Sequence, residues 1–327
     1  MKVLIVSHSQ DNDSVNLVTE SLSYRGVTTL RLDTDYYPAG LRFSTLQTGD
    51  SRKSFVGTGA GKMELSDLES VWYRRFFAGS CLYPEELGDT YEACLKESQM
   101  TLWGHIQSLP CFQFDPISAV RRADYKELQL REAADLGIAC PLTLISNDPE
   151  AVREFIDLAN GSVVAKMQSQ FAVYRGEEEN VVFTNRVSRE NLADLDGLRY
   201  SPMIFQEMVP KRLELRVTVV GHRVFAAAVD SQQSEESKVD WRRQGNQLAV
   251  TWKAFEFPEE EAHKLRRLTG RFGLNYAAAD YILTPSGEFV FLELNAAGEW
   301  LWLQWYAGLD VASAIAEVLI DRDARRV

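Results

Sequence analysis

The hydrophobic and polar pattern at the start of the chain predicts a βαβ unit. Residues 2–7 carry the apolar run Val-Leu-Ile-Val, as in a buried strand. The pattern over 14–24 favours a helix ended by Gly26, and a second strand is expected over 27–32. This order is typical of a doubly wound α/β sheet. No Gly-x-Gly-x-x-Gly follows the first strand, so a dinucleotide site is not expected.

The middle of the chain alternates between short apolar runs and helical patterns. Residues 41–65 are rich in Gly, Ser and Thr and predict a polar hairpin or meander, followed by a strand over 71–73. One long helix is expected over 85–107, and another from an N-cap at Ser118 to Leu136. The remaining pattern predicts helices over 148–159, 258–271 and 309–319, strands over 162–167 and 203–209, and a hairpin over 213–228.

A second hairpin is predicted over 276–295, where two apolar runs flank the turn-forming sequence Thr-Pro-Ser-Gly. The first run carries Asp280, and the second carries Glu293 and Asn295. Side chains two apart on a strand share a face, so Glu293 and Asn295 point the same way and Leu294 points into the core. If Asp280 faces them, three oxygen ligands converge in a set that suits Mg²⁺. The alternative is an ordinary hairpin with solvated acids on its outer face.

Composition and charge narrow the class of protein. The chain has 35 Lys and Arg against 47 Asp and Glu, a formal net charge of −12, which argues against nucleic-acid binding. Its four cysteines are widely spaced with no Cys-x-x-Cys pair, as expected for reduced thiols in a cytoplasmic protein. No stretch approaches the roughly 18 consecutive apolar residues that a membrane span needs. We therefore predict a soluble cytoplasmic protein with no membrane partner.

The stretch that ends in Asn295 resembles the metal-binding end of ATP-grasp ligases. In both, an Asp, here Asp280, is followed after about a dozen residues by Glu-x-Asn. From Met1 to about Val318, the chain resembles more closely the ATP-grasp ligases that cyclise microviridin-type ribosomal peptides (graspetides), nearer their ester-forming branch. The segments that carry this resemblance are Leu4-Ile-Val-Ser, Trp72-Tyr-Arg-Arg75, Val164-Ala-Lys-Met-Gln168 and Val239-Asp-Trp-Arg-Arg243. The resemblance implies an α/β (α+β) ATP-grasp fold. It has an N-terminal pre-ATP-grasp domain over 1–115, a central subdomain over 116–205 and a C-terminal subdomain over 206–327.

The resemblance also implies ATP and Mg²⁺ as cofactors, with the metal on Asp280, Glu293 and Asn295. The residues implied for ATP are Lys126, Lys166, Gln168, Glu207, Met208, Val209 and Glu214. Lys166 lies in an otherwise apolar strand, where a lysine is costly unless its ammonium reaches a partner such as a phosphate. Lys126 could instead be a solvated helix lysine, and Glu214 a surface acid. The loop after Gln168 lacks the glycine-rich sequence of many phosphate lids.

Two arginines are implied for catalysis. Arg216 is expected on the transferred phosphate and acyl intermediate, where a bidentate guanidinium is suited, although many strand arginines only extend toward solvent. Arg243 is a candidate for the same cleft. An edge formed by Arg74 and Arg75 could also face the cleft, although adjacent arginines usually pair with nearby acids.

The substrate implied by the resemblance is a ribosomal precursor peptide. Its Asp or Glu side chain would join a Ser or Thr hydroxyl as an ester, or a Lys amine as an amide. Acids around Glu190, Asp194 and Asp196 could receive an arginine of the leader peptide. Trp300 could form a wall of the peptide groove, although a tryptophan-rich segment is more often core. A homodimer is expected. The alternatives are a ligase acting on a small metabolite or protein terminus, and a binding module without turnover.

Overall fold

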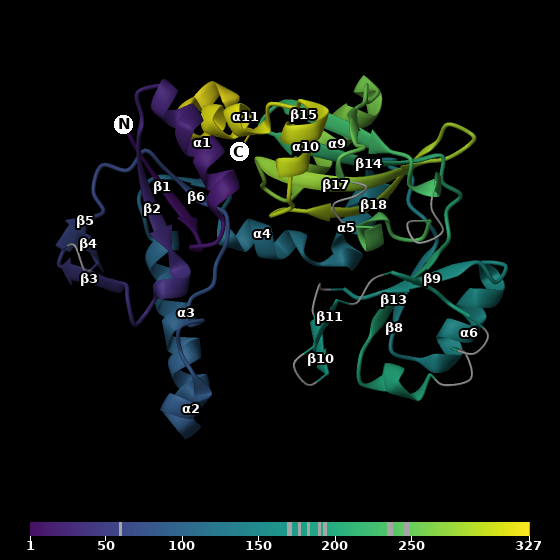
Figure 1. Cartoon of the computed structure of the whole chain (residues 1–327), viewed down its shortest axis with the longest axis horizontal. Helices are drawn as coiled ribbons and strands as arrows, with labels where there is room; N and C mark the ends of the chain where they lie inside the picture. The colour runs from purple at the N-terminus through teal and green to yellow at the C-terminus, as the bar shows by residue number, and fades with distance from the viewer. Residues whose placement is uncertain are drawn as a thin grey trace.

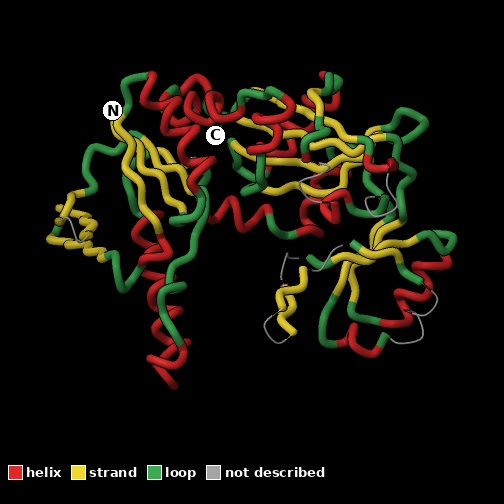
Figure 2. Tube along the Cα trace, viewed as in Figure 1, coloured by secondary structure: helices red, strands yellow, loops and turns green. Residues whose placement is uncertain are grey.

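The computed structural model of the chain divides into an N-terminal body, a five-stranded sheet and a smaller four-stranded sheet (Figures 1 and 2). The structure describes residues 1–58, 61–168, 172–175, 178–181, 184–188, 191, 195–233, 238–244 and 249–326. Within these ranges no helix is long and apolar enough to cross a membrane. The four cysteines are free, as the sequence predicts.

The N-terminal body is built on a parallel sheet, which confirms the predicted βαβ start. Its strands lie in the order β2 (Thr28–Asp33), β1 (Lys2–Ser7), β6 (Ser70–Tyr73) and β7 (Phe112–Phe114). Alternate residues of β1 face opposite sides: Val3 and Ile5 share a core with helix α1 (Asn12–Tyr24). Leu4 and Val6 share another core with helix α3 (Tyr91–Gln107). Both faces of the sheet are therefore covered.

The polar region after β2 forms the predicted meander. It consists of the antiparallel strands β3 (Arg42–Thr48), β4 (Ser51–Thr58) and β5 (Gly61–Glu64). The single long helix predicted over 85–107 is wrong. The chain instead forms a short helix, α2 (Pro84–Leu87), and a 3-10 turn, Gly88–Thr90, before α3 begins. Gly88 has a φ of +52°, which residues with a side chain rarely adopt, and the helix ends there.

The smaller sheet has a core of its own. Its strands lie in the order β12 (Asn185–Arg186), β9 (Val163–Lys166), β13 (Met203–Glu207) and β8 (Thr143–Ser146). Helix α6 (Pro149–Leu158) packs Val152 and Phe155 against Val163 and Phe205 of this sheet. A separate pair, β10 (Ala172–Arg175) and β11 (Glu178–Val181), lies between this sheet and the N-terminal body (Figure 1).

The five-stranded sheet is the largest element. Its strands lie in the order β16 (Lys253–Ala254), β15 (Arg223–Val229), β14 (Leu213–Val220), β17 (Tyr276–Leu283) and β18 (Phe289–Asn295). One face packs against α4 (Ile117–Ala123), α5 (Lys126–Asp135) and α9 (Glu259–Arg271). The other face is partly covered by α10 (Leu301–Ala307) and α11 (Val311–Ile320), and α11 also contacts α1 of the N-terminal body.

Short 3-10 helices complete the described secondary structure. Besides Gly88–Thr90 they are Thr34–Tyr36, Asp196–Arg199, Ser231–Gln233, Trp241–Gln244 and Arg322–Ala324.

The continuous helix predicted from Ser118 to Leu136 is also wrong. Helix α4 is capped by Pro116 and closed by Asp124, and Tyr125 adopts an extended conformation before α5 begins at Lys126. The Gln129 side chain stabilises the break because its amide donates to the carbonyl of Ala123. Lys126 is thus the first residue of α5 and does not lie in the middle of one long helix. Its side chain therefore points in a different direction from the one that a continuous helix would give it.

Candidate active site

A row of charged side chains crosses three adjacent strands of the five-stranded sheet. Arg216 on β14 lies opposite Asp280 on β17, and Asp280 lies opposite Glu293 on β18. Residues paired in this way point to the same face. The Arg216 Nη1 atom donates to Asp280 Oδ1 at 2.8 Å. Lys126 reaches the row from the first residue of α5, with its Nζ atom 2.8 Å from Glu293 Oε2.

A β-bulge shapes the strand that carries Glu293. The register shifts after Asp280, so that Tyr281 pairs with Phe291 and Leu292 is the extra residue. Leu292 therefore packs with Ile282 in a small apolar cluster beside the charged row. The hairpin and its pairing follow the prediction, but nothing in the alternation of apolar residues indicated the bulge.

The charged row borders a cavity of about 530 Å³ between the two sheets. A cavity of this size is within the range of small-molecule and cofactor sites, which span about 300–1,000 Å³. Arg216 and all of the residues predicted for ATP and metal line it. They are Lys126, Lys166, Gln168, Glu207, Met208, Val209, Glu214, Asp280, Glu293 and Asn295. Residues spread over 170 positions of sequence are thus brought to one cavity; their individual roles remain predictions.

The segment between the two sheets is anchored at the edge of this cavity. The Leu142 amide donates to Glu207 Oε1 at 3.0 Å, and the Met208 amide donates to the carbonyl of Ser162 at 2.8 Å. Glu214 is buried and pairs with Lys211, whose Nζ atom lies 2.9 Å from Glu214 Oε1. Burial raises the pKa of Glu214, and the Lys211 charge opposes that shift.

Two family profiles match consecutive parts of the chain. Residues 2–121 match the MvdD pre-ATP grasp domain, and residues 123–319 match the RimK-like ATP-grasp domain. The second match covers more than half of the chain. The chain belongs to the RimK-like ATP-grasp ligases. The predicted fold class is therefore confirmed.

Two solved structures are similar to nearly the whole of this ATP-grasp ligase. The RiPP-associated ATP-grasp ligase of Chryseobacterium gregarium, solved with ADP and a leader and core peptide, is 38% identical. The alignment covers 98% of this chain and 97% of that chain, with a TM-score of 0.93. The macrocyclase MdnC from Microcystis aeruginosa, solved with precursor peptide MdnA, is 40% identical over 98% and 99% of the two chains, with a TM-score of 0.89. The resemblance to peptide-cyclising ligases is confirmed at this level.

A curated relative is more distant. Beta-citrylglutamate synthase B of Danio rerio is 25% identical over 232 residues, which cover 68% of this chain and 54% of the relative. The chain thus spans about half the length of that protein.

The donor atoms of the charged row fit the cofactors of an ATP-grasp ligase. Within the ranges that the structure describes, no group of three or more His, Cys, Asp or Glu side chains could hold a metal ion. The row offers the carboxylates of Asp280 and Glu293, and Asn295, two residues beyond Glu293 on β18, adds a carboxamide beside them. Oxygen donors in this number suit Mg²⁺, which completes its shell with water and substrate phosphates.

Two other predicted site residues, Arg243 and Asp196, do not line this cavity. Arg243 is exposed and donates to the Thr184 carbonyl at 3.0 Å and to Asn185 Oδ1 at 2.7 Å. Asp196 is exposed on the 3-10 helix of the smaller sheet's layer, and Asp194, like Glu190, lies outside the described residues.

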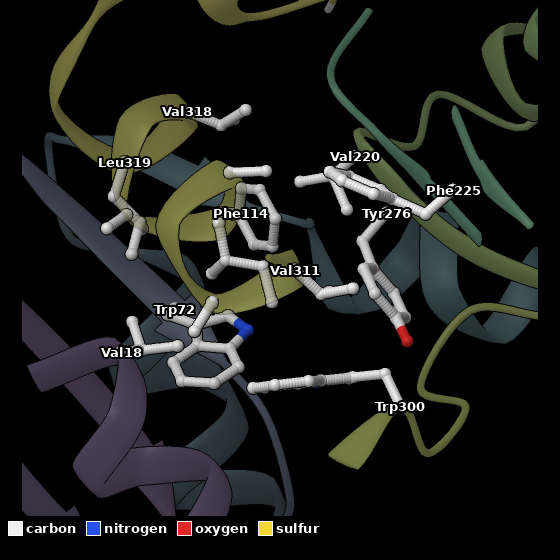
Figure 3. Close-up of a cluster of buried hydrophobic side chains, with 14 of the residues drawn as sticks. Val18, Trp72, Phe114, Val220, Phe225, Tyr276, Trp300, Val311, Val318 and Leu319 are labelled. Carbon is white, nitrogen blue, oxygen red and sulfur yellow. The ribbon is translucent and has the colours of Figure 1, made fainter. Parts of the chain in front are cut away.

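The prediction that Trp300 forms a wall of a peptide groove is wrong. It is 1% exposed and belongs to the core shared by the N-terminal body and α11. Figure 3 shows its indole lying close to Trp72, below Val311. It offers no surface to a peptide, and its role is packing.

The cavity wall also contains residues that sequence reasoning did not assign to the site, among them Asp124, Lys211, Asp240 and Trp241. Lys211 also donates to the Val239 carbonyl at 3.0 Å, and Asp240 accepts from the Thr184 amide at 3.2 Å. A signal for Lys211 was present, because it lies three residues before the acid predicted for ATP. Asp240 and Trp241 were in a segment of the family resemblance, in which only the arginines were considered.

Proposed function

We propose that this ligase is a peptide macrocyclase that uses ATP and Mg²⁺. It activates Asp or Glu side chains of a ribosomal precursor peptide and closes rings with Ser or Thr hydroxyls as ω-esters. The observation that carries the proposal is the likeness, over 98% of the chain, to two ligases solved with peptides. The cavity with its charged row supports the same conclusion, since it combines cations for phosphates with oxygen donors for a metal.

The proposed reaction has two steps. A carboxylate oxygen of the peptide attacks the γ-phosphorus of ATP, and the bond to the ADP oxygen breaks. A hydroxyl oxygen of the same peptide then attacks the acyl carbon of the acylphosphate. Inorganic phosphate leaves, and the hydroxyl proton passes to solvent. Each ring therefore lowers the mass of the peptide by one water.

The chain's contribution to these steps is positioning and charge neutralisation. Lys126 and Lys166 would bind phosphate oxygens, and Arg216 would stabilise the charge on the transferring phosphoryl group and the acyl carbon's oxygen. Asp280, Glu293 and Asn295 would hold Mg²⁺, which supplies further neutralisation of the phosphates. Arg216 and Lys126 already lie within 2.8 Å of the carboxylates of this set, so cations and metal ligands share one small region.

The second candidate is amide formation, with a lysine of the peptide or a small amine as nucleophile. It is favoured by the match to the RimK-like family and by relatives named as glutamate ligases and synthases. The first half of the reaction is the same, so the charged row does not discriminate between the two.

Co-expression with the peptide encoded by a short reading frame beside this gene tests the proposal. Mass spectrometry should show the loss of one water for each ring, and mild alkaline hydrolysis should reverse it for esters but not for amides. Asp280→Asn provides the inactive control. Loss of no water from that peptide, with ADP release when glutamate and a small amine are supplied, would support the second candidate instead.

A further inference from the structure

The loop Ala296–Trp300 connects β18 to α10 and begins directly after Asn295. Its main chain is bonded from several directions. The Ala297 amide donates to Asn295 Oδ1 at 3.1 Å, and the Tyr276 hydroxyl donates to the Gly298 carbonyl at 2.6 Å. Arg216 Nη2 lies 3.4 Å from the carbonyl of Glu299. The loop therefore contacts both a predicted metal ligand and the arginine of the charged row.

A fourth set of contacts comes from the N-terminal body. Arg74 directly follows β6 and is only 3% exposed. Its Nη1 atom donates to the Ala297 carbonyl at 3.0 Å, and its Nη2 atom lies 2.7 Å from Glu299 Oε2. Arg75 also pairs with the Glu299 carboxylate. One buried side chain thus holds both the main chain and a side chain of the loop.

The topology of the N-terminal sheet explains why an arginine lies there. Strands β1 and β6 are neighbours, and the chain leaves β1 toward β2 on the opposite side. In open parallel sheets such a switch point leaves a crevice at the carboxyl ends of the strands. In this chain the Arg74 side chain lies in that crevice and extends from it to the loop.

The buried charge is balanced on the N-terminal side by Asp11. Its carboxylate lies 3.5 Å from Arg74 Nε and also accepts hydrogen bonds from the hydroxyls of Ser7 and Ser14. Burial alone would raise the pKa of Asp11, but Arg74 and the two hydroxyls hold it below its ordinary value. Asp11 is thereby fixed in place, whereas Glu299 is 39% exposed and depends on the arginines for its position.

We propose that Arg74 is a positioning residue for the active site, which fixes the Ala296–Trp300 loop so that Asn295 and Arg216 are held where metal and nucleotide bind. The inference rests on the proposed function, because it assumes that the cavity holds both. Residues that orient metal ligands through one intermediate contact typically change metal affinity by about 10- to 100-fold when they are replaced. We expect an effect of this size for Arg74.

The test is binding of Mn²⁺, a paramagnetic substitute for Mg²⁺, measured by electron paramagnetic resonance in the presence of ADP. Arg74→Gln should weaken binding by about 10- to 100-fold. Arg74→Lys should recover part of the loss, because it keeps the charge without the fork geometry. Glu299→Ala removes the same contact from the loop side and keeps the inference testable if Arg74→Gln does not fold. The double variant, Arg74→Gln with Glu299→Ala, should bind Mn²⁺ no more weakly than the single variant with the lower affinity, because both changes remove the same contact.

Arg326→Gln is the matched control. Arg326 is also partly buried where the N-terminal body meets the large sheet, but it donates to carbonyls of Arg266 and Leu274 and not to the loop. It should leave Mn²⁺ affinity unchanged even if it lowers the thermal midpoint. If Arg74→Gln and Glu299→Ala bind Mn²⁺ like this control, the inference is refuted while the proposed function stands. If the wild-type protein binds neither ADP nor Mn²⁺, the proposed function falls, and the inference with it.

Discussion

Replacing Gly298 by Ala should disturb the active site, because the added methyl group would clash with a neighbouring strand. A Cβ atom at Gly298 would lie 2.6 Å from Ala278 Cβ. Two carbon atoms in contact normally lie about 3.5–4.0 Å apart, so roughly 1 Å of movement is required. Ala278 is fully buried on β17, the strand held between β14 and β18, and has little freedom to shift. The loop that carries Gly298 must therefore move.

The expected cost follows from that geometry. Overpacking of a close-packed interior typically costs about 1–3 kcal/mol. Movement of the loop would also lengthen the bond from the Tyr276 hydroxyl to the Gly298 carbonyl, now 2.6 Å, and the bond to Asn295 Oδ1. We expect Gly298→Ala to lower the free energy of unfolding by about 1–3 kcal/mol and to weaken binding of Mn²⁺ and ADP.

The assay is urea unfolding together with Mn²⁺ binding, and a second variant makes it specific. Ala278→Gly removes the methyl group that Gly298→Ala would meet, so the double variant should be more stable than the sum of the two single changes. Coupling between residues in contact is typically about 0.5–3 kcal/mol. Gly104→Ala is the control, because its Cβ would meet nothing within 4 Å and alanine favours a helix. Strictly additive effects of the two changes would refute the reasoning.

Asp280→Asn and Glu293→Gln should each abolish Mn²⁺-dependent ADP binding while circular dichroism stays native, and wild-type affinity in either would contradict the metal assignment. Burial lowers the pKa of His105 to about 4. The neutral ring is therefore favoured in the folded state, and stability should fall by at most about 3 kcal/mol as the pH drops from about 6.5 to 4. Urea unfolding at several pH values should show that the free energy of unfolding falls less steeply with pH in His105→Gln than in the wild-type protein. An equal pH dependence in the two proteins would refute the prediction. Trp300→Ala should cost about 3–5 kcal/mol, whereas Trp305→Ala, at a position 51% exposed, should change stability by less than about 0.5 kcal/mol. Equal midpoints for these two variants would refute the core assignment.

The sequence predicted most of the fold because its elements have strong local signals. The apolar run of β1, the turn at 284–287 and the glycine after α1 each define an element without reference to the rest of the chain. The two helix predictions that failed did so at local breaks. Gly88 lies inside an otherwise helical sequence, and the break at Asp124 and Tyr125 is stabilised by a side chain, Gln129, that also bonds the main chain of Leu294. That second contact is long-range, so no local pattern contains it.

The sequence named the residues of the charged row and the other cavity residues predicted for ATP and metal, but it did not give their arrangement. Strand periodicity could place Glu293 and Asn295 on one face, but not Asp280 with them. The register of the turn alone would pair Asp280 with Leu292, and the β-bulge after Asp280 is what brings it opposite Glu293. The ion pairs of this row depend on the alignment of β14 with β17 and on the direction of α5, which only the tertiary structure supplies. Trp300 shows the opposite error. Its position in sequence suggested a wall of the cleft, but the loop before α10 turns it into the core.

The same face of the large sheet serves both as core and as site, and this division explains the arrangement of the chain. Toward Tyr276 and Val220 the face is covered by α11 and Trp300 and belongs to the apolar core. Toward Arg216 and Asp280 the helices end and the cavity begins. Arg216 lies at the boundary, with its guanidinium 5.2 Å from the centre of the Trp302 ring of α10 and 2.8 Å from Asp280. Arg216 is the buried member of this pair, whereas the Asp280 side chain is 30% exposed at the cavity. Removal of Asp280 would therefore leave a buried charge with little water to replace its partner. The packing that buries Arg216 therefore also fixes the direction in which its guanidinium faces the cavity. The packing between the N-terminal body and the large sheet is thereby linked to the geometry of the site.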